Sequence, residues 1–360
     1  SNPSGEVATI MVPNCGAITV IWRHELAQTV LHVQAGDELY MAPRSLPASE
    51  QAVVSVIVDA PPPPDTSGLL VSSGCGYGYN DAEHPTQYEV NWFSSCGERT
   101  TFLVQPREPL TGEVDPTFYA VLEDVGRTDA IQNPLHVSSW SSIASGHQLS
   151  IQMPVAAKLH TSGSSVAYSH AYPGRTTSST TGGIAHELDV VFPEFGSGHR
   201  ISVGYEEVDD VASGAWAQSF DGRLSPVRTV DLTGALLPSI RSAAASADQH
   251  RPTLSWTVDS SDNVEDVAIV RTYGISAAGG SVEWRFAVPP GQREIVVPEM
   301  PSDLEVSFFA PDVSVSLFET SDVPDYAAAR SDFTRFFLGG HLSFPPGHVW
   351  RTSKRGPHAF

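Results

Sequence analysis

The sequence predicts an all-β protein made of tandem β-sandwich domains. Apolar and polar residues alternate with a period of two from end to end, whereas long stretches with a period of 3.6 are hard to find. Clusters of Gly, Pro, Asn and Asp separate these stretches at the spacing typical of sandwiches. The chain has 360 residues, 41% of them hydrophobic. Since domains usually have about 100–150 residues, we expect more than one packed core.

The first third contains several strand-like segments, namely GAITVIWRH, TVLHVQA, AVVSVIVDA, YEVNWFSS and TTFLVQP. APPPPD at 60–65 has four consecutive prolines, which cannot enter a central strand and predict an exposed spacer. We assign residues 1–110 to an N-terminal β domain. Whether this range holds one β unit or two is left open.

The cysteines indicate the environment of the protein. Cys75 and Cys96 have 20 residues between them, and a disulfide closing that loop would contribute about 3 kcal/mol. A metal clip is disfavoured because no C-x-x-C spacing occurs. The alternative is a pair of unbonded core cysteines, with Cys15 as a buried small residue or another disulfide partner. The Cys75–Cys96 disulfide predicts an oxidising, extracellular or cell-surface location.

The middle of the chain continues the strand pattern with TFYAVLEDV, LHVSSW, HQLSIQMPV, SSVAYSHAY, HELDVVFPEF, HRISVGYEEV, GAWAQSF and VRTVDLT. We assign residues 111–238 to a central β-sandwich. GRTTSSTTGG at 174–183 predicts a mobile hairpin loop because its Gly, Ser and Thr residues bury little apolar area. ALLPSIRSAAASADQH at 235–250 predicts a helix or linker and marks the boundary to the last domain.

Residues 239–332 form the last predicted sandwich. Pro252, Leu254 and Trp256 precede a strand, and VPPGQREIVVPEMP and a further strand follow. Over residues 250–320 this order resembles a fibronectin type III module, or more broadly an immunoglobulin-like sandwich. The resemblance implies that Trp256 packs in the core, whereas Leu304 stands where the family usually has a corner tyrosine. It implies a fold but no function.

Residues 333–360 form a basic, aromatic tail without Asp or Glu. The tail has a formal charge of +4, so the rest of the chain carries −25, which together give −21. We expect such a tail to dock on an acidic body, either its own or a neighbour's. The alternative is an ordinary terminal strand with a frayed end. The candidate interaction residues are Phe333, Arg335, Phe336, Phe337, Trp350, Arg351, Lys354 and Arg355.

One acidic segment is a candidate calcium site. DSSDNVED at 259–266 supplies oxygen ligands of the kind that Ca²⁺ prefers, from Asp259, Asp262, Asn263, Glu265 and Asp266. The alternative is a solvated loop. No G-x-S-x-G, P-loop or H-E-x-x-H motif occurs, so we assign no catalytic residue and, calcium apart, no cofactor.

Charge and hydropathy restrict the function. With 41 acidic and 20 basic residues, the chain is a poor partner for nucleic acid. It has no apolar run of about 18 residues, so we expect no transmembrane segment. It shows no export signal, so we expect that any such signal has been removed or never existed. We predict a non-enzymatic exported protein at the cell surface or outside the cell. It would be an adhesin-like binder or a subunit of a homomeric assembly, with itself, another surface protein or a glycan as partner.

The alternative function is a carbohydrate-active hydrolase or its carbohydrate-binding accessory module. Hydrolysis needs two carboxylates on either side of the scissile bond, about 5–9.5 Å apart. An acid-rich chain offers many such pairs. The sequence does not give their separation.

Overall fold

A computed structural model describes most of the chain. The described residues are 16–22, 26–37, 39, 51–74, 76–81, 84–93, 97–108, 117–143, 146–168, 170–208, 210, 212–222, 224–225, 227–260, 262, 264–276, 279–299, 306–308, 312–331 and 345–356. Strands dominate them, with two short helices, which confirms the predicted all-β class. Several predicted site residues lie outside the described residues, namely Cys15, Cys75, Cys96, Asn263, Phe333, Arg335, Phe336 and Phe337.

The chain divides into two compact units. Unit 1 consists of Ser1–Arg44, Leu237–Gly340 and Thr352–Phe360, and unit 2 of Ser45–Leu236 and His341–Arg351. This division is based on contacts between residues. It does not test whether the four ranges predicted from the sequence fold as independent domains, so those ranges stay predictions.

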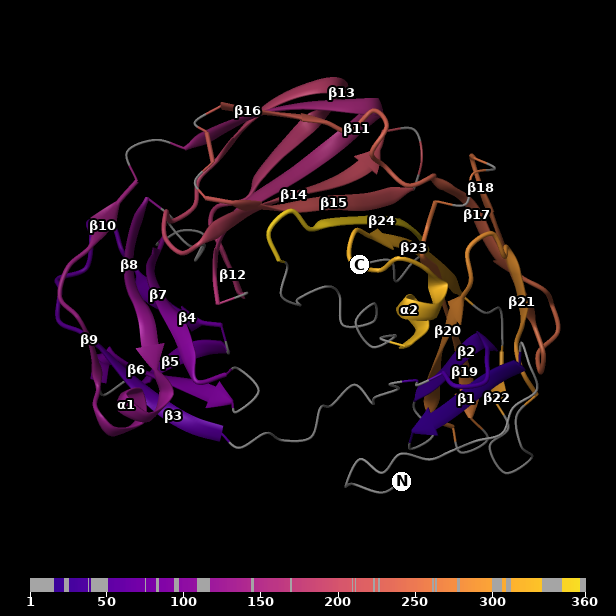
Figure 1. Cartoon of the computed structure of the whole chain (residues 1–360), viewed down its shortest axis with the longest axis horizontal. Coiled ribbons are helices and arrows are strands. Elements are labelled where there is room, and N and C mark those ends of the chain that lie inside the picture. Colours follow the sequence, from indigo (N-terminus) through magenta and orange to yellow (C-terminus); the bar gives the residue numbers. More distant parts are fainter. Residues whose placement is uncertain are drawn as a thin grey trace. The chain divides into compact units, whose positions relative to one another are not determined.

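Unit 1 contains two sheets (Figure 1). The smaller has the order β17-β18-β21 and the larger the order β1-β2-β20-β19-β23-β24, with β22 beside β19. Of β24, the residues from Thr352 onward belong to this unit. The bounds are β1 Gly16–Trp22, β2 Leu26–Val33, β17 Ile240–Ala245, β18 Thr253–Val258, β19 Val267–Ser276, β20 Ser281–Val288, β21 Glu294–Val296, β22 Val306–Ser307, β23 Val313–Thr320, α2 Tyr326–Ser331 and β24 Val349–Arg355.

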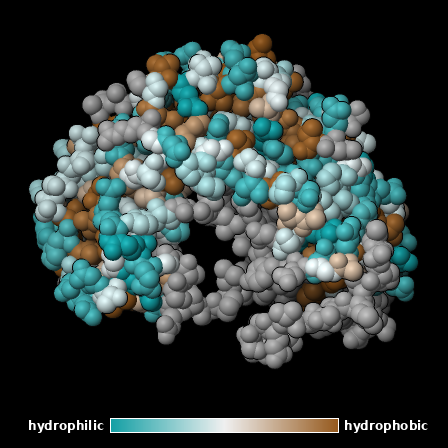
Figure 2. All heavy atoms as spheres, viewed as in Figure 1, coloured by the Kyte–Doolittle hydropathy of each residue, from teal (hydrophilic) through white to brown (hydrophobic). Residues whose placement is uncertain are grey.

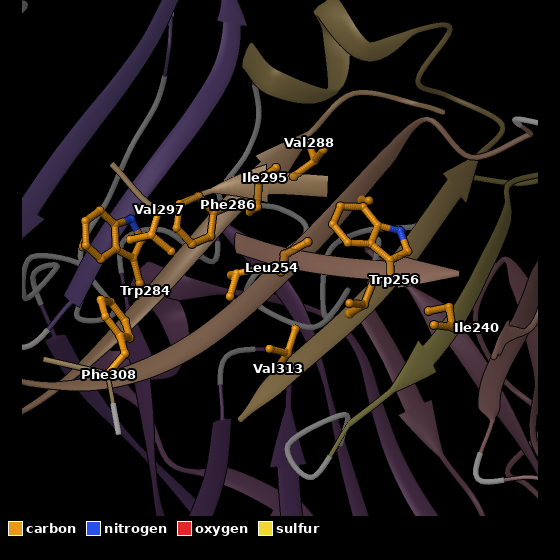
Figure 3. Packing of buried hydrophobic residues seen from close by; sticks show 14 of the residues in the cluster. Ile240, Leu254, Trp256, Trp284, Phe286, Val288, Ile295, Val297, Phe308 and Val313 are labelled. Carbon is orange, nitrogen blue, oxygen red and sulfur yellow. The ribbon is translucent and has the colours of Figure 1, made fainter. Parts of the chain in front are cut away.

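The core of unit 1 is aromatic and aliphatic (Figure 3). Trp256 from β18 is 2% exposed, so it packs inside as the resemblance implies. Trp284 and Phe286 from β20 stack with ring centroids 5.5 Å apart and contribute to the same cluster as Leu254 and Phe308. Large aromatic side chains buried in this way dominate core energetics.

The helix predicted as one alternative at 235–250 does not form, although the division between the two units does fall within this range, at Leu237. Residues Ile240–Ala245 form β17, which pairs antiparallel with β18. Ile240 is fully buried and Ala243 packs against the core, so tertiary packing overrides the helical preference of the alanines.

Unit 2 contains a sheet with the order β10-β8-β7-β4-β5-β6-β3-β9 (Figure 1), and α1 contacts both β3 and β8. A second group of strands has the order β15-β14-β11-β12, with β13 and β16 also paired to β11. The bounds are β3 Gln51–Val58, β4 Gly68–Ser73, β5 Gly76–Asp81, β6 His84–Phe93, β7 Arg99–Arg107, β8 Phe118–Gly126, α1 Arg127–Gln132, β9 Leu135–Val137, β10 Ser141–Ser142, β11 His147–Ala167, β12 His170–Pro173, β13 Thr177–Val190, β14 Gly198–Glu207, β15 Ser213–Asp221 and β16 Val227–Asp231.

The loop predicted at 174–183 is also wrong over most of its length. Thr177–Val190 forms a single strand, and its first residues, Thr177 to Ser179, pair with Leu159 to Thr161 of β11. Backbone hydrogen bonds to a long neighbouring strand hold this Ser- and Thr-rich segment extended, and Thr itself favours strands. A composition poor in apolar residues therefore did not indicate a loop here.

Candidate interaction sites in unit 1

The first candidate site is the hairpin of β1 and β2. β2 runs parallel to β20, with Leu26 opposite Glu283 and Val30 opposite Ala287. Ala27 is fully buried within the core cluster that also holds Trp284. A segment near one end of the sequence therefore completes the sheet that residues 267–320 build, and no local pattern in the sequence predicts this pairing.

Side chains of the body hold this hairpin in place. The Trp284 indole Nε1–H donates to Thr29 Oγ1 at 2.9 Å, and both side chains are buried. The Tyr326 hydroxyl lies 3.0 Å from the carbonyl oxygens of Leu31 and Ala287 and donates to them, thus joining the two strands. Burial raises the pKa of Tyr326 above its ordinary value, so the hydroxyl stays a donor.

Arg330 of α2 adds a charged contact to the same hairpin. Its guanidinium donates to the His32 carbonyl at 2.7 Å and to the Asp37 carboxylate at 2.8 Å. The Arg330 side chain is 4% exposed, so the ion pair is largely shielded from water. Together with Tyr326, it ties the end of β2 and the residues that follow it to α2.

β1 forms the outer edge of this sheet among the described residues. Its sequence, GAITVIW, has no charged residue and no proline. Every other edge strand of the described sheets is two to four residues long or carries an ionisable side chain; these are β9, β10, β12, β13, β16, β17, β21 and β22. Natural proteins usually protect edges by shortness, charge, proline or a β-bulge. β1 has a register shift between Gly16 and Ile18, and among the described residues it is otherwise an edge without charge or proline.

The second candidate site is a row of polar side chains that crosses four strands of the larger sheet. Gln28 of β2 lies opposite Arg285 of β20, which lies opposite Arg271 of β19, which lies opposite Ser314 of β23. Residues that pair in this way share one face of a sheet. Three of the four are buried, at 2% exposure for Gln28, 4% for Arg285 and 2% for Ser314. We call these four side chains the polar row.

Further ionisable groups neighbour the polar row. Arg285 forms a bidentate ion pair with Glu283, at 2.7 and 2.8 Å. Burial, then the charge of Glu283, raises the pKa of Tyr273, which lies opposite Glu283. Burial, then the charge of Arg271, lowers the pKa of Lys354. Shifted pKa values that come from burial and specific charges gather at binding and catalytic sites.

The predicted calcium ligands bind different groups of the protein rather than converging on one point. Asp259 accepts from the Ser239 backbone N–H at 2.9 Å and from Arg241 at 2.8 Å. Glu265, whose side chain is fully buried, pairs with Arg293 at 2.5 Å.

Asp266 and Asp262 take part in hydrogen bonds that involve backbone N–H groups. Asp266 accepts from the Thr320 N–H at 2.8 Å, and the Asp262 N–H donates to the Ser260 hydroxyl. No three His, Cys, Asp or Glu residues lie close enough to hold a metal ion within the part of the chain that the structure describes. Calcium binding, to which Asn263 would contribute, stays a prediction.

Of the predicted tail, residues 345–356 are described, and Val349–Arg355 form the strand β24. Trp350 of β24 is 7% exposed, and Arg351 follows it in the same strand. In unit 1, the Arg355 guanidinium donates to the carbonyl of Ile240 at 2.9 Å. In unit 2, the Ser219 N–H donates to the carbonyl of His348 at 2.9 Å. Docking of the whole tail on an acidic surface stays a prediction.

Neither a protein-family model nor a curated protein matches this chain. No helix in the described residues is long and apolar enough to cross a membrane. The functional argument therefore depends on the two candidate sites.

The sequence analysis did not find the polar row. VRTYG and VEWRF each alternate, which places Arg271 and Tyr273 on one face of β19, and Glu283 and Arg285 on the same side of β20, opposite to the core residue Trp284. This alternation could be recognised in the sequence. The pairing of β19 with β20, which brings Arg271 and Tyr273 next to Arg285 and Glu283, could not be predicted, because it depends on the register of the two strands.

Proposed function

We propose that the protein is a non-enzymatic subunit of a homomeric assembly at the cell surface or outside the cell, with an adhesin-like role. The observation that carries this proposal is that β1 is an edge strand without charge or proline among the described residues. Seven residues without charge or proline offer about 23 Å of backbone donors and acceptors to another strand. An antiparallel pairing of β1 with β1 of a second copy satisfies these groups around a two-fold axis.

Charge also favours the β1 edge over other surfaces as the contact between copies. With a net charge of −21, two copies repel each other wherever acidic surfaces meet. β1 itself carries no charge, so pairing there juxtaposes no like charges within the strand. On the face shown in Figure 2, the coloured hydrophobic residues lie in small groups between hydrophilic ones, which favours a backbone edge over a broad apolar patch.

The strand order supports the fibronectin-like module that is part of this proposal. β17, β18 and β21 form one sheet, and β20, β19 and β23 belong to the other, which is an order typical of immunoglobulin-like sandwiches. Such modules are common in surface proteins. The proposed Cys75–Cys96 disulfide fits the same location.

A charge on the exposed position of β1 tests the proposal. Ala17 is exposed, so Ala17→Lys adds a charge to the edge without disturbing the core. We expect light scattering to show multimers of the unaltered chain, favoured by raising the salt to about 0.5 M, which screens the acidic repulsion. Ala17→Lys should lower the fraction of multimer at least tenfold.

Val227→Lys is the matched control because Val227 is 58% exposed on β16, an edge that already carries charges. This control should leave the multimer unchanged. A chain that is monomeric at every salt concentration and at high protein concentration would contradict assembly. Equal loss of multimer in both variants would show that added charge, rather than the β1 edge, matters.

A further inference from the structure

The β1–β2 hairpin completes unit 1, and we call the elements from β17 to α2 the body of this unit. Ala27, Thr29 and Val30 of β2 are fully buried, and Ala27 belongs to the same core cluster as Trp284. β2 is also the parallel neighbour of β20. Without the hairpin, β20 would be an open edge and part of the core would face water, so each body needs a hairpin.

The hairpin lies far from the body along the chain. The larger segment of unit 2, Ser45–Leu236, comes between β2 and the first strand of the body. The ion pair of Arg330 with Asp37 accordingly joins residues 293 positions apart. A short connection keeps a segment at high local concentration near its docking place, and no short connection does so here. The hairpin of a second copy can therefore compete for the same place.

The contacts that hold the hairpin do not depend on which copy supplies it. They include the pairing of β2 with β20, the hydrogen bond from Trp284 to Thr29 and the bonds from Tyr326 and Arg330. Each of these joins the hairpin to the body, so all of them form equally well between two copies. For this reason, exchange of an identical element is a low-cost route to a dimer.

We propose that the β1–β2 hairpin of one copy docks on the body of a second copy, whose own hairpin docks on the first in return. The two copies then form a dimer around a two-fold axis. This inference rests on the proposed homomeric assembly and names the segment that each copy gives to the other. β1 remains the outer strand of each completed sheet, so pairing between β1 edges can join such dimers further.

The Arg330–Asp37 ion pair allows a test by charge reversal, because the two side chains are only 4% and 18% exposed. Asp37→Arg leaves two cations facing each other in a copy that keeps its own hairpin, and Arg330→Asp leaves two anions. When the two variants combine, exchange restores both ion pairs, since each hairpin then meets an opposite charge on the other body. Producing both variants in the same cells lets hairpins and bodies meet during folding.

The two variants differ in mass, so native mass spectrometry separates their heterodimer from both homodimers. Exchange predicts at least tenfold more heterodimer than either homodimer. Pairing of β1 edges alone is insensitive to positions 37 and 330. It predicts a statistical mixture, with about twice as much heterodimer as each homodimer.

A double variant tests whether chains with an intact ion pair exchange as well. Asp37→Arg combined with Arg330→Asp keeps opposite charges within each chain. Produced together with the unaltered chain, it should form homodimers and at least tenfold less heterodimer, because exchange between the two kinds of chain opposes like charges. This test does not depend on a chain that has lost the ion pair, so misfolding of a single variant does not confuse it.

Reversal of an ion pair within the body is the control. Arg241 and Asp259 are 2.8 Å apart and both belong to the body side of unit 1, so Arg241→Asp and Asp259→Arg produced together should give the statistical mixture. A statistical mixture of the double variant with the unaltered chain would overturn hairpin exchange and leave assembly through the β1 edge in place. Absence of any dimer of the unaltered chain would overturn the exchange and the proposed assembly together.

Discussion

At the scale of single residues, Gly163 shows how tightly unit 2 is packed. A Cβ on Gly163 would lie 2.2 and 2.4 Å from two ring carbons of Phe192. Phe192 is fully buried and lies next to the rings of His147 and His199, with centroids 4.8 and 5.1 Å away. The ring therefore has little freedom to move aside.

Gly163→Ala should thus lower the free energy of unfolding by about 1–3 kcal/mol, measured by urea denaturation at an unchanged m-value. Gly68→Ala is the control. Gly68 is also in a strand, but its Cβ would meet nothing within 4 Å. The control should change stability by no more than about 0.5 kcal/mol. Equal effects would show that backbone entropy, rather than contact with Phe192, decides the result.

Asp266 makes stability depend on pH. Burial, and after it the charges of Glu319, Asp322 and Asp325, raises its pKa from 3.8 to about 6. Because the folded pKa is above the unfolded one, folding favours the protonated form. The resulting stabilisation is complete below pH 3.8 and is lost as the pH rises to about 6.

Asp266→Asn should therefore stabilise the protein at pH 7 and have little effect near pH 3.5. A shift of this size corresponds to about 3 kcal/mol, which partial exposure reduces to about 1–2 kcal/mol. Asp231→Asn is the control of opposite sign, since hydrogen bonds from Thr233 lower the pKa of Asp231. Melting temperatures across pH 3–8 check both. Destabilisation at pH 7 by Asp266→Asn would contradict the argument.

At the scale of elements, α2 fastens the β1–β2 hairpin. Tyr326→Phe removes the hydroxyl that bonds the carbonyls of Leu31 and Ala287, and should cost about 1–3 kcal/mol because both acceptors lose a donor. The effect should be local. Amide hydrogen exchange in β2 should accelerate more than exchange in β18.

Tyr77→Phe is the matched control, because Tyr77 is 57% exposed. It should leave exchange in β2 unchanged. If Tyr326→Phe accelerates exchange equally in β2 and β18, the hairpin and the sandwich open as a single cooperative unit, and α2 has no separate fastening role.

Strands were predictable from the sequence, but their partners were not. AVVSVIVDA and HRISVGYEEV became β3 and β14 because alternation directly reports a strand with one buried face. β2 was also predicted as a strand. Its parallel pairing with β20 depends on contacts such as Trp284 to Thr29, which join residues 255 positions apart. No local pattern encodes such contacts.

The candidate sites were only partly predictable for the same reason. Lys354 was identified from the basic composition of the tail, whereas Arg271 and Arg285 were passed over as ordinary strand residues. Their significance comes from the register that places them opposite each other. The uncharged sequence of β1 was visible from the start, but only the sheet order shows that it is an edge.

At the scale of the whole molecule, the two compact units suggest two unfolding events. Leu254 belongs to the cluster in unit 1 and Ile201 to a cluster in unit 2, and both side chains are fully buried. Multidomain proteins commonly unfold in more than one transition because each core melts on its own. We expect calorimetry to show two transitions, one for each unit.

Leu254→Ala should lower one transition and Ile201→Ala the other. Each leaves a cavity and should cost about 2–5 kcal/mol, which corresponds to a shift of about 5–10 °C in units of this size. Each variant is the control for the other, because a substitution in one unit must leave the transition of the other unit unchanged. If either substitution lowers both transitions together, or only one transition exists, the two units are energetically coupled.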